Sequence, residues 1–200
     1  MIVKMLLEGY PSLPLLSEEG KSIPYEERRG WSVYWLIDPL DGTKEFIKKN
    51  GEFTVNIALV SDGVPLLGVV YAPILDICYY AKKGEGAYKD GVRLPCAKSH
   101  PFTVVASKSH NNEETEKFIE MLKKEHQNLE TKSIGSSLKL CLVAEGAAEI
   151  YPRLAPSMEW DSAAAHAIVK ESGKKVVDFH TKEELRYNKE NLLNPSFLVC

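Results

Sequence analysis

The sequence predicts an α/β protein in which an α+β half with an antiparallel sheet precedes a half of alternating strands and helices. Three observations support this class. The 200 residues are 44% hydrophobic and 26% charged, which is typical of a soluble globular chain with a real core. Strand-like runs separated by turn residues follow one another between residues 33 and 81, and beyond Pro101 strands alternate with helical patterns. We place a soft boundary near residues 95–101, which predicts units of residues 1–98 and 99–200.

The first half contains one very compact strand candidate. Residues 33–37 are β-branched, aromatic or aliphatic and predict a buried strand. Asp38-Pro39 should stop it, because proline cannot donate to a β-ladder and disfavours helical angles in the residue before it. Residues 53–60, 66–71 and 77–81 are three further strand-like runs. Together they predict an antiparallel meander, with Asp38 at a strand end.

The second half is predicted as alternating elements. They are a strand at residues 102–107, a polar helix at 112–126, a short strand, a helix at 136–145 and a strand at 148–151. Asp161 then opens an apolar helix, and Gly173 is the expected glycine after its C-cap.

Charge and cysteine usage exclude several classes. The net charge of −3 offers no basic excess for a nucleic-acid polymer, so a phosphate ligand should be small and locally held. The four cysteines lack zinc-ligand spacing, and no signal peptide or transmembrane segment is evident. We expect a protein of the reducing cytoplasm whose metal ligands are oxygens, with an oligomeric state that the sequence leaves open.

Three acidic elements stand at the ends of predicted elements. They are Glu18-Glu19 after an apolar segment, Asp38 and Asp41 after the buried strand, and Asp161 before the apolar helix. Mg²⁺ takes carboxylate, carbonyl and water oxygens, and a pair of such ions needs a carboxylate that bridges them. Asp38 is our candidate bridge, because the proline turn could bring Asp38, the Leu40 carbonyl and Asp41 together.

Phosphate binding is predicted beside this metal site. Gly42 permits a tight turn, and Thr43 begins a helix whose first amides and positive dipole end favour an anion. Each feature alone has an ordinary alternative: Glu18-Glu19 as a solvated pair, Asp161 as an N-cap and the turn at Asp38 as an Asx turn. Their order along one chain favours the metal interpretation, since folding alone does not require them together.

These elements resemble the signatures of the inositol monophosphatase superfamily. Ser17-Glu18-Glu19 matches its (G/S)EE element, residues 38–43 its DP(I/L)DGT element, and residues 160–164 its WDxAA element. The resemblance implies a layered αβαβα sugar-phosphatase-like fold. Family members begin with a further helix pair and a VTxAD element that has no match here, so the resemblance also implies an N-terminally truncated form of uncertain activity.

Within the superfamily, the chain is similar to the bacterial 3′(2′),5′-bisphosphate nucleotidase branch (CysQ-type). The similarity lies in residues 41–59, Arg186-Tyr187-Asn188-Lys189 and Leu193-Asn194-Pro195. It implies hydrolysis of adenosine 3′,5′-bisphosphate to AMP and phosphate, Mg²⁺ as cofactor, inhibition by lithium, and a role in sulfur assimilation. It also implies a cytoplasmic enzyme that can be peripheral to the inner membrane.

The resemblance assigns roles to individual positions. Glu18, Asp38 and the Leu40 carbonyl are implied to hold one metal ion, and Asp38, Asp41 and Asp161 a second. The implied catalytic residues are Glu18, Asp38, Asp41 and Thr43. The implied substrate-binding residues are Gly42, Thr43, Ser136, Lys139, Arg153 and Asp161. From the residues alone, Ser136 is equally part of an ordinary helix start, and Lys139 and Arg153 are equally surface charges.

Two other functions stay open from the sequence. An inositol or sugar monophosphatase shares the metal elements. A nonhydrolysing phosphate or nucleotide binder is suggested by the unmatched VTxAD aspartate.

Overall fold

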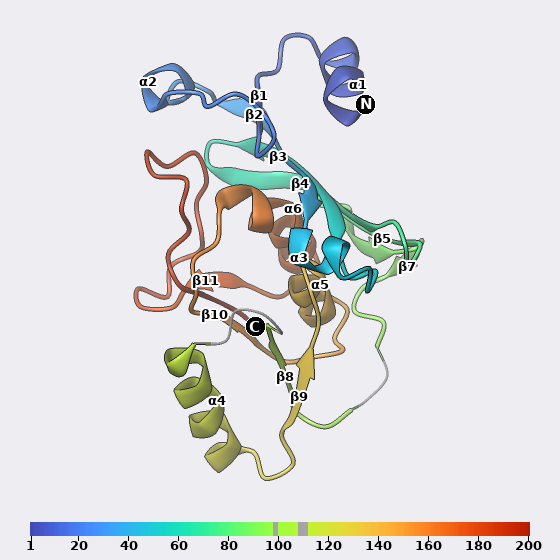
Figure 1. Cartoon of the computed structure of the whole chain (residues 1–200), viewed down its shortest axis with the longest axis vertical. Helices are drawn as coiled ribbons and strands as arrows, with labels where there is room; N and C mark the ends of the chain where they lie inside the picture. The colour runs from blue at the N-terminus through green and yellow to red at the C-terminus, as the bar shows by residue number, and fades with distance from the viewer. Residues whose placement is uncertain (98–99, 108–111) are drawn as a thin grey trace.

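A seven-stranded sheet from the first half of the chain forms the frame of the molecule (Figure 1). The computed structural model describes residues 1–97, 100–107 and 112–200. The strands lie in sequence order: β1 (Leu15–Ser17), β2 (Val33–Asp41), β3 (Thr54–Ser61), β4 (Val64–Ala72), β5 (Ile77–Lys82), β6 (Gly86–Lys89) and β7 (Val92–Arg93). β1 pairs with β2 in parallel, and all later neighbours are antiparallel. The predicted meander is therefore confirmed.

One strand boundary was predicted wrongly. β2 does not stop at Asp38-Pro39 but continues to Asp41, with a break in register between the pairs Asp38↔Asn56 and Asp41↔Thr54. Proline is tolerated here because it lies in a β-bulge, and the pairing of β2 with β1 already ends at Ile37. The bulge brings the end of the strand to the edge of the site described below.

Helix α6 (Glu159–Glu171) packs against the sheet, mainly on β3 and β4. The contact is so close that a Cβ atom on Gly68 of β4 would lie 2.0 Å from the Ala164 carbonyl oxygen of α6. Only glycine permits this approach. The helix begins at Glu159 rather than at the predicted Asp161, and Gly173 follows its C-cap with φ +87°, as predicted.

The remaining elements form two smaller sheets and further helices. The three-stranded sheet has the order β10 (Tyr151–Arg153), β12 (Phe197–Val199), β11 (Val176–Asp178), and β8 (Thr103–Ala106) pairs in parallel with β9 (Glu130–Ser133). The helices are α1 (Ile2–Gly9), α2 (Tyr25–Arg28), α3 (Thr43–Ile47), α4 (Glu113–Glu125) and α5 (Leu138–Ala144).

Most predictions for this half are confirmed, including α4, whose N-cap Asn112 accepts from the Thr115 amide. The strand predicted at residues 148–151 instead spans Tyr151–Arg153, so Arg153 ends the strand rather than following it. The division predicted at residue 98 falls outside the described residues and stays a prediction.

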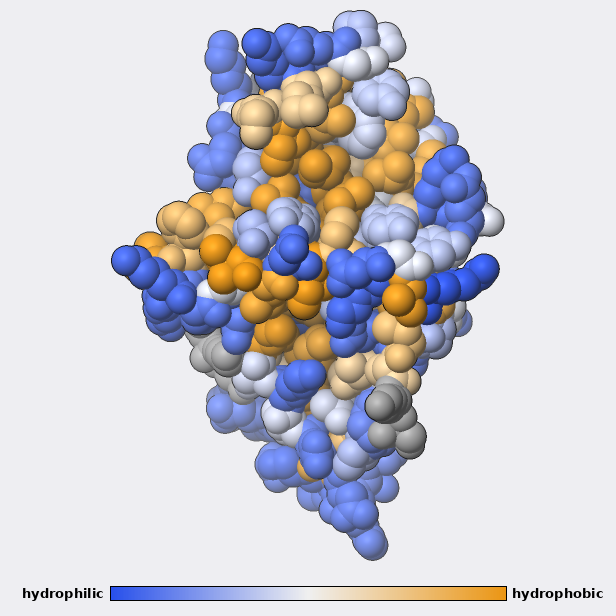
Figure 2. Space-filling model, turned by 90° about the vertical axis from the view of Figure 1, so that its right-hand side faces the viewer, coloured by the Kyte–Doolittle hydropathy of each residue, from blue (hydrophilic) through white to orange (hydrophobic). Residues whose placement is uncertain are grey.

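The sheet has an apolar second side. Along β3, buried Asn56, Ala58 and Val60 alternate with half-buried Ile57 and Leu59, which point the opposite way. Figure 2 shows hydrophobic side chains gathered in a broad area on one side of the molecule. Among the helices of the described residues, none is long and apolar enough to cross a membrane.

Candidate metal and phosphate site

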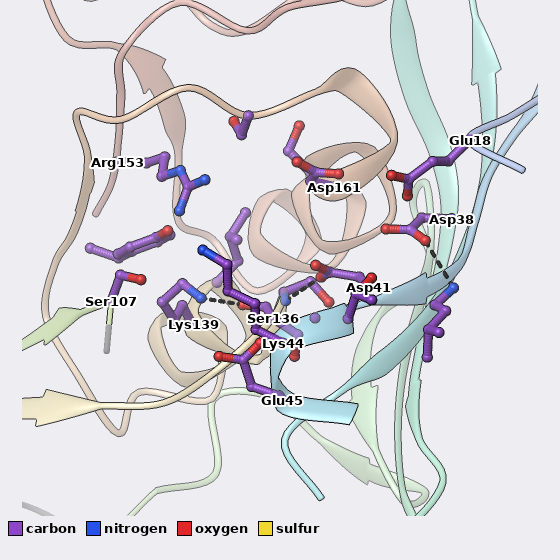
Figure 3. Close-up of a pocket in the computed structure, with 18 of the residues that line it drawn as sticks. Glu18, Asp38, Asp41, Lys44, Glu45, Ser107, Ser136, Lys139, Arg153 and Asp161 are labelled. Carbon is purple, nitrogen blue, oxygen red and sulfur yellow. Dashed lines mark hydrogen bonds between the residues drawn. The ribbon is translucent and has the colours of Figure 1, made fainter. Parts of the chain in front are cut away.

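Three carboxylates from distant parts of the chain meet in one place. Glu18 follows β1, Asp38 lies in β2, and Asp161 lies in the first turn of α6. One carboxylate oxygen from each lies within 4.8 Å of the others. Figure 3 shows the three groups gathered at one end of a pocket. The structure thus brings together side chains that the sequence placed at three separate element ends.

The electrostatics of this group favour a bound cation. Burial, followed by the charges of Asp41, Glu18 and Asp161, raises the pKa of Asp38 to about 9. Burial and the charge of Asp41 raise the pKa of Asp161 to about 7, and burial also raises that of Glu18. Neighbouring carboxylates repel one another when all are ionised, and a hard cation relieves that repulsion. An all-oxygen donor set of this kind fits Mg²⁺.

Backbone amides orient two of these carboxylates. Asp38 Oδ1 accepts from the Leu40 N–H at 2.9 Å, across the bulge of β2. Asp161 Oδ2 accepts from the Met158 N–H at 2.8 Å. Asp161 is therefore not the N-cap but the third residue of α6, reaching back to the N-cap Met158. The capping contact engages Oδ2, so capping and metal binding are compatible.

Asp41 is held more firmly, although it lies outside the group of three. Its Oδ2 accepts from the Ser137 N–H at 2.6 Å, from Asn56 Nδ2 at 3.2 Å and from Thr54 Oγ1 at 3.3 Å. Sequence reasoning missed these supporting roles. The sequence pattern could have revealed them, because Thr54 and Asn56 are polar residues at positions of an alternating strand that face the core, and buried polar groups need hydrogen-bond partners.

All ten residues predicted for the site line one cavity of about 280 Å³. The predicted residues are Glu18, Asp38, Leu40, Asp41, Gly42, Thr43, Ser136, Lys139, Arg153 and Asp161. Gly42 is the N-cap of α3 with φ +91°, a left-handed conformation that glycine adopts without steric cost. Thr43 is the first residue of that helix, as predicted.

The other end of the cavity is basic. Figure 3 shows Lys139 and Arg153 across the cavity from Glu18 and Asp38. Lys139 is buried, its Nζ donates to the Ser136 carbonyl at 2.7 Å, and burial lowers its pKa to about 8. Arg153 Nη2 donates to the Pro156 carbonyl at 2.6 Å. Lys139 is therefore not an ordinary surface charge, whereas Arg153 is half-buried at the cavity wall.

Several lining residues were missed by sequence reasoning. They are Lys44, Glu45, Ser107, Ser137, Leu140, Tyr151, Ser157, Ser162 and Phe197. Most belong to elements adjoining the predicted positions. Ser107 follows β8 and carried no local signal, since only the fold brings that strand end to the cavity.

The raised carboxylate pKa values predict how metal binding and stability depend on pH. Between pH 4 and the folded-state pKa values, the folded state binds more protons than the unfolded state, so metal-free stability falls as pH rises. We therefore expect Mg²⁺ to raise the melting temperature more at pH 8 than at pH 6. Calorimetric scans with EDTA or saturating Mg²⁺ at both pH values measure this. Equal Mg²⁺ shifts at both would contradict the coupling between the carboxylates and the cation.

Comparison with known proteins gives consistent matches along the chain. The model of the inositol monophosphatase family matches residues 1–198. The 3′(2′),5′-bisphosphate nucleotidase CysQ of Salmonella typhimurium is 50% identical over 203 residues, covering 98% of this chain and 80% of that protein. The crystal structure of CysQ from Bacteroides thetaiotaomicron superposes with a TM-score of 0.94 at 49% identity, covering 98% of this chain and 80% of that chain. A 2′AMP-bound structure of SaIMPase-II has a TM-score of 0.80 at 26% identity, covering 99% and 74%.

Proposed function

Because the chain belongs to the inositol monophosphatase family, we propose that it is a metal-dependent phosphomonoesterase that hydrolyses adenosine 3′,5′-bisphosphate to AMP and phosphate. The observation that carries this proposal is the polarity of the cavity. A cluster of carboxylates occupies one end, and Lys139 and Arg153 occupy the other. A substrate with two phosphate groups matches such a cavity, one phosphate at each end.

We assign the metal ligands to the acidic end. Glu18, Asp38 and the Leu40 carbonyl would hold one Mg²⁺, and Asp38, Asp41 and Asp161 a second. Bound there, Mg²⁺ would polarise the phosphoryl oxygens and lower the pKa of a coordinated water. The chain itself orients the carboxylates that would hold the metal ions. Backbone amides hold one oxygen of Asp38 and one of Asp161, which leaves the second oxygen of each carboxylate for the cavity.

The phosphate that is removed would bind at the start of α3. Gly42 and Thr43 line the cavity beside Asp41. Amides in the first turn of a helix have no acceptor within that helix, so they are suited to phosphate oxygens. The left-handed Gly42 has a Cβ position 3.3 Å from Ser136 Cβ, so a side chain here would crowd the phosphate-binding turn.

The second phosphate would bind at the basic end. Arg153 offers a planar fork of donors that suits bidentate phosphate binding, and Lys139 offers a point charge. With a pKa of about 8, Lys139 remains mainly protonated at pH 7. Ser136, whose carbonyl accepts a hydrogen bond from Lys139, lies between Lys139 and Asp41 along the cavity wall (Figure 3).

Phosphate release from adenosine 3′,5′-bisphosphate and from an inositol monophosphate, each measured across a Mg²⁺ titration, tests the function. We expect no release in EDTA and a kcat/KM at least about tenfold higher for the bisphosphate, the scale of one charge-assisted contact. Equal kcat/KM values would instead support a sugar monophosphatase. Calorimetric binding of the bisphosphate without phosphate release would support a nonhydrolysing binder.

A further inference from the structure

We propose that Glu159 and Asn194 are positioning residues, which fix the Asp161 carboxylate by clamping the C-terminal segment 188–194 against the start of α6. The role of Asp161 in this inference rests on the proposed function. The segment contains two stretches that the proposed chemistry does not use, namely part of Arg186-Tyr187-Asn188-Lys189 and of Leu193-Asn194-Pro195. Neither Glu159 nor Asn194 lines the cavity.

The clamp begins with backbone pairing just before the helix. Residues 157–159 run antiparallel to residues 192–194, with a β-bridge between Met158 and Leu193. The Asn194 N–H donates to the Ser157 carbonyl at 2.8 Å, and the Glu159 N–H donates to the Leu192 carbonyl at 2.9 Å. The two chain segments are therefore in register where α6 begins.

Glu159 fastens the segment at one end. Its side chain is 0% exposed, yet it carries a carboxylate. Oε2 accepts from the Asn188 N–H at 2.7 Å, and Oε1 accepts from the Lys189 N–H at 3.0 Å and from Lys189 Nζ at 2.5 Å. A buried carboxylate with this many donors defines one geometry, because any shift leaves a charge without partners.

Asn194 fastens the other end and reaches the residues around Asp161. It is 5% exposed, and its Nδ2 donates to the Met158 carbonyl at 2.7 Å and to Ser162 Oγ at 3.0 Å. Met158 is the residue whose own N–H holds Asp161 Oδ2. Ser162 directly follows Asp161. Asn194 thus hydrogen-bonds to the first turn of α6 on both sides of the proposed ligand Asp161.

A metal ligand held by such partners should lose affinity when the partners are altered. Changes in groups that orient metal ligands commonly cost 10–100-fold in metal affinity or activity. A residue with a merely structural role reduces the folded fraction instead, which lowers the amount of active protein without changing the affinity of what remains. Metal affinity therefore separates the two roles.

The test compares Mg²⁺ binding in Glu159→Gln and Asn194→Ala with that in the unchanged chain, by isothermal titration calorimetry without substrate and by the Mg²⁺ dependence of turnover. Glu159→Gln keeps the side-chain shape but loses the charge and one acceptor. We expect the Kd for Mg²⁺ and the half-saturating Mg²⁺ concentration to rise at least about tenfold in both variants. The KM for the bisphosphate at saturating Mg²⁺ should change less than twofold.

Glu145→Gln is the matched control. Glu145 is also buried and also binds a lysine, Lys89, along with the Tyr79 hydroxyl, but it does not line the cavity. This control should lower the melting temperature and leave the Kd for Mg²⁺ unchanged. An unchanged Kd in folded Glu159→Gln and Asn194→Ala, or an equal rise in Glu145→Gln, would overturn the positioning role. If the unchanged chain binds Mg²⁺ without hydrolysing the bisphosphate, the proposed reaction fails, and the calorimetric Kd values still decide the clamp.

Discussion

Replacing Asp38 with Asn is expected to reduce Mg²⁺-dependent turnover by roughly 10³-fold, a loss of about 4 kcal/mol in transition-state stabilisation. Asp38 is 1% exposed and lies within reach of both Glu18 and Asp161, which is the place of a carboxylate shared by two ions. Asn keeps an oxygen that can accept from the Leu40 N–H, so the local turn is preserved. Only the charge and one ligand oxygen are lost. Initial rates at saturating Mg²⁺ measure the effect.

Glu18→Gln is the matched comparison for this prediction. Glu18 is solvent-exposed and is proposed to touch one ion only, so its loss should be smaller than that of Asp38 by at least about tenfold. Equal losses in the two variants would contradict the bridging role of Asp38.

A fold control is built into the same experiment. The raised pKa of Asp38 means that its ionised form destabilises the metal-free folded state. Asp38→Asn should therefore melt at or above the temperature of the unchanged chain in EDTA at pH 8. A lower melting temperature there would attribute the activity loss to misfolding.

Replacing Arg153 with Ala is expected to weaken binding of the phosphate that is not removed, while leaving hydrolysis of the reacting phosphate nearly unchanged. Turnover of adenosine 3′,5′-bisphosphate should fall by about 10–100-fold, the scale of a charge-assisted hydrogen-bond pair worth roughly 1.5–3 kcal/mol. Hydrolysis of a simple monophosphate should change little, because it lacks the second phosphate. The ratio of the two kcat/KM values at saturating Mg²⁺ is the quantity to measure.

Arg153→Lys refines this result. Lysine keeps the positive charge but cannot bind phosphate through a planar fork, so the bisphosphate rate should fall to an intermediate value. If Arg153→Ala slows both substrates equally, Arg153 supports the structure or the reacting phosphate, and its Nη2 contact with the Pro156 carbonyl would then explain the loss.

The sequence by itself identified the acidic, glycine and basic residues that line one part of the site, but it missed nine other lining residues. Each acidic element is adjacent to an apolar run, so its position near the end of an element was predictable from the local sequence, although β2 continues past Asp38 to Asp41 and α6 begins two residues before Asp161. All ten predicted residues line the same cavity. The meander and the existence of the apolar helix near residue 161 were also predictable, because hydrophobic periodicity and turn residues act over short stretches of chain, but the helix begins at Glu159 and not at the predicted Asp161.

Only the tertiary structure decided how these residues are held. Strand β2 runs through Pro39 because a bulge and the end of β1 remove the need for its N–H, which no local pattern reveals. Asp41 is oriented by the N–H of Ser137, which lies 96 positions away in the sequence. Asp161 is oriented by Met158, whose carbonyl in turn accepts a hydrogen bond from Asn194 of the C-terminal segment. Hydrogen bonds between segments so far apart depend on how elements pack, and side-chain periodicity carries no information about that packing. The sequence thus determined the chemical groups, and their geometry was decided by the packing of α6 on the sheet and of the C-terminal segment against the start of α6.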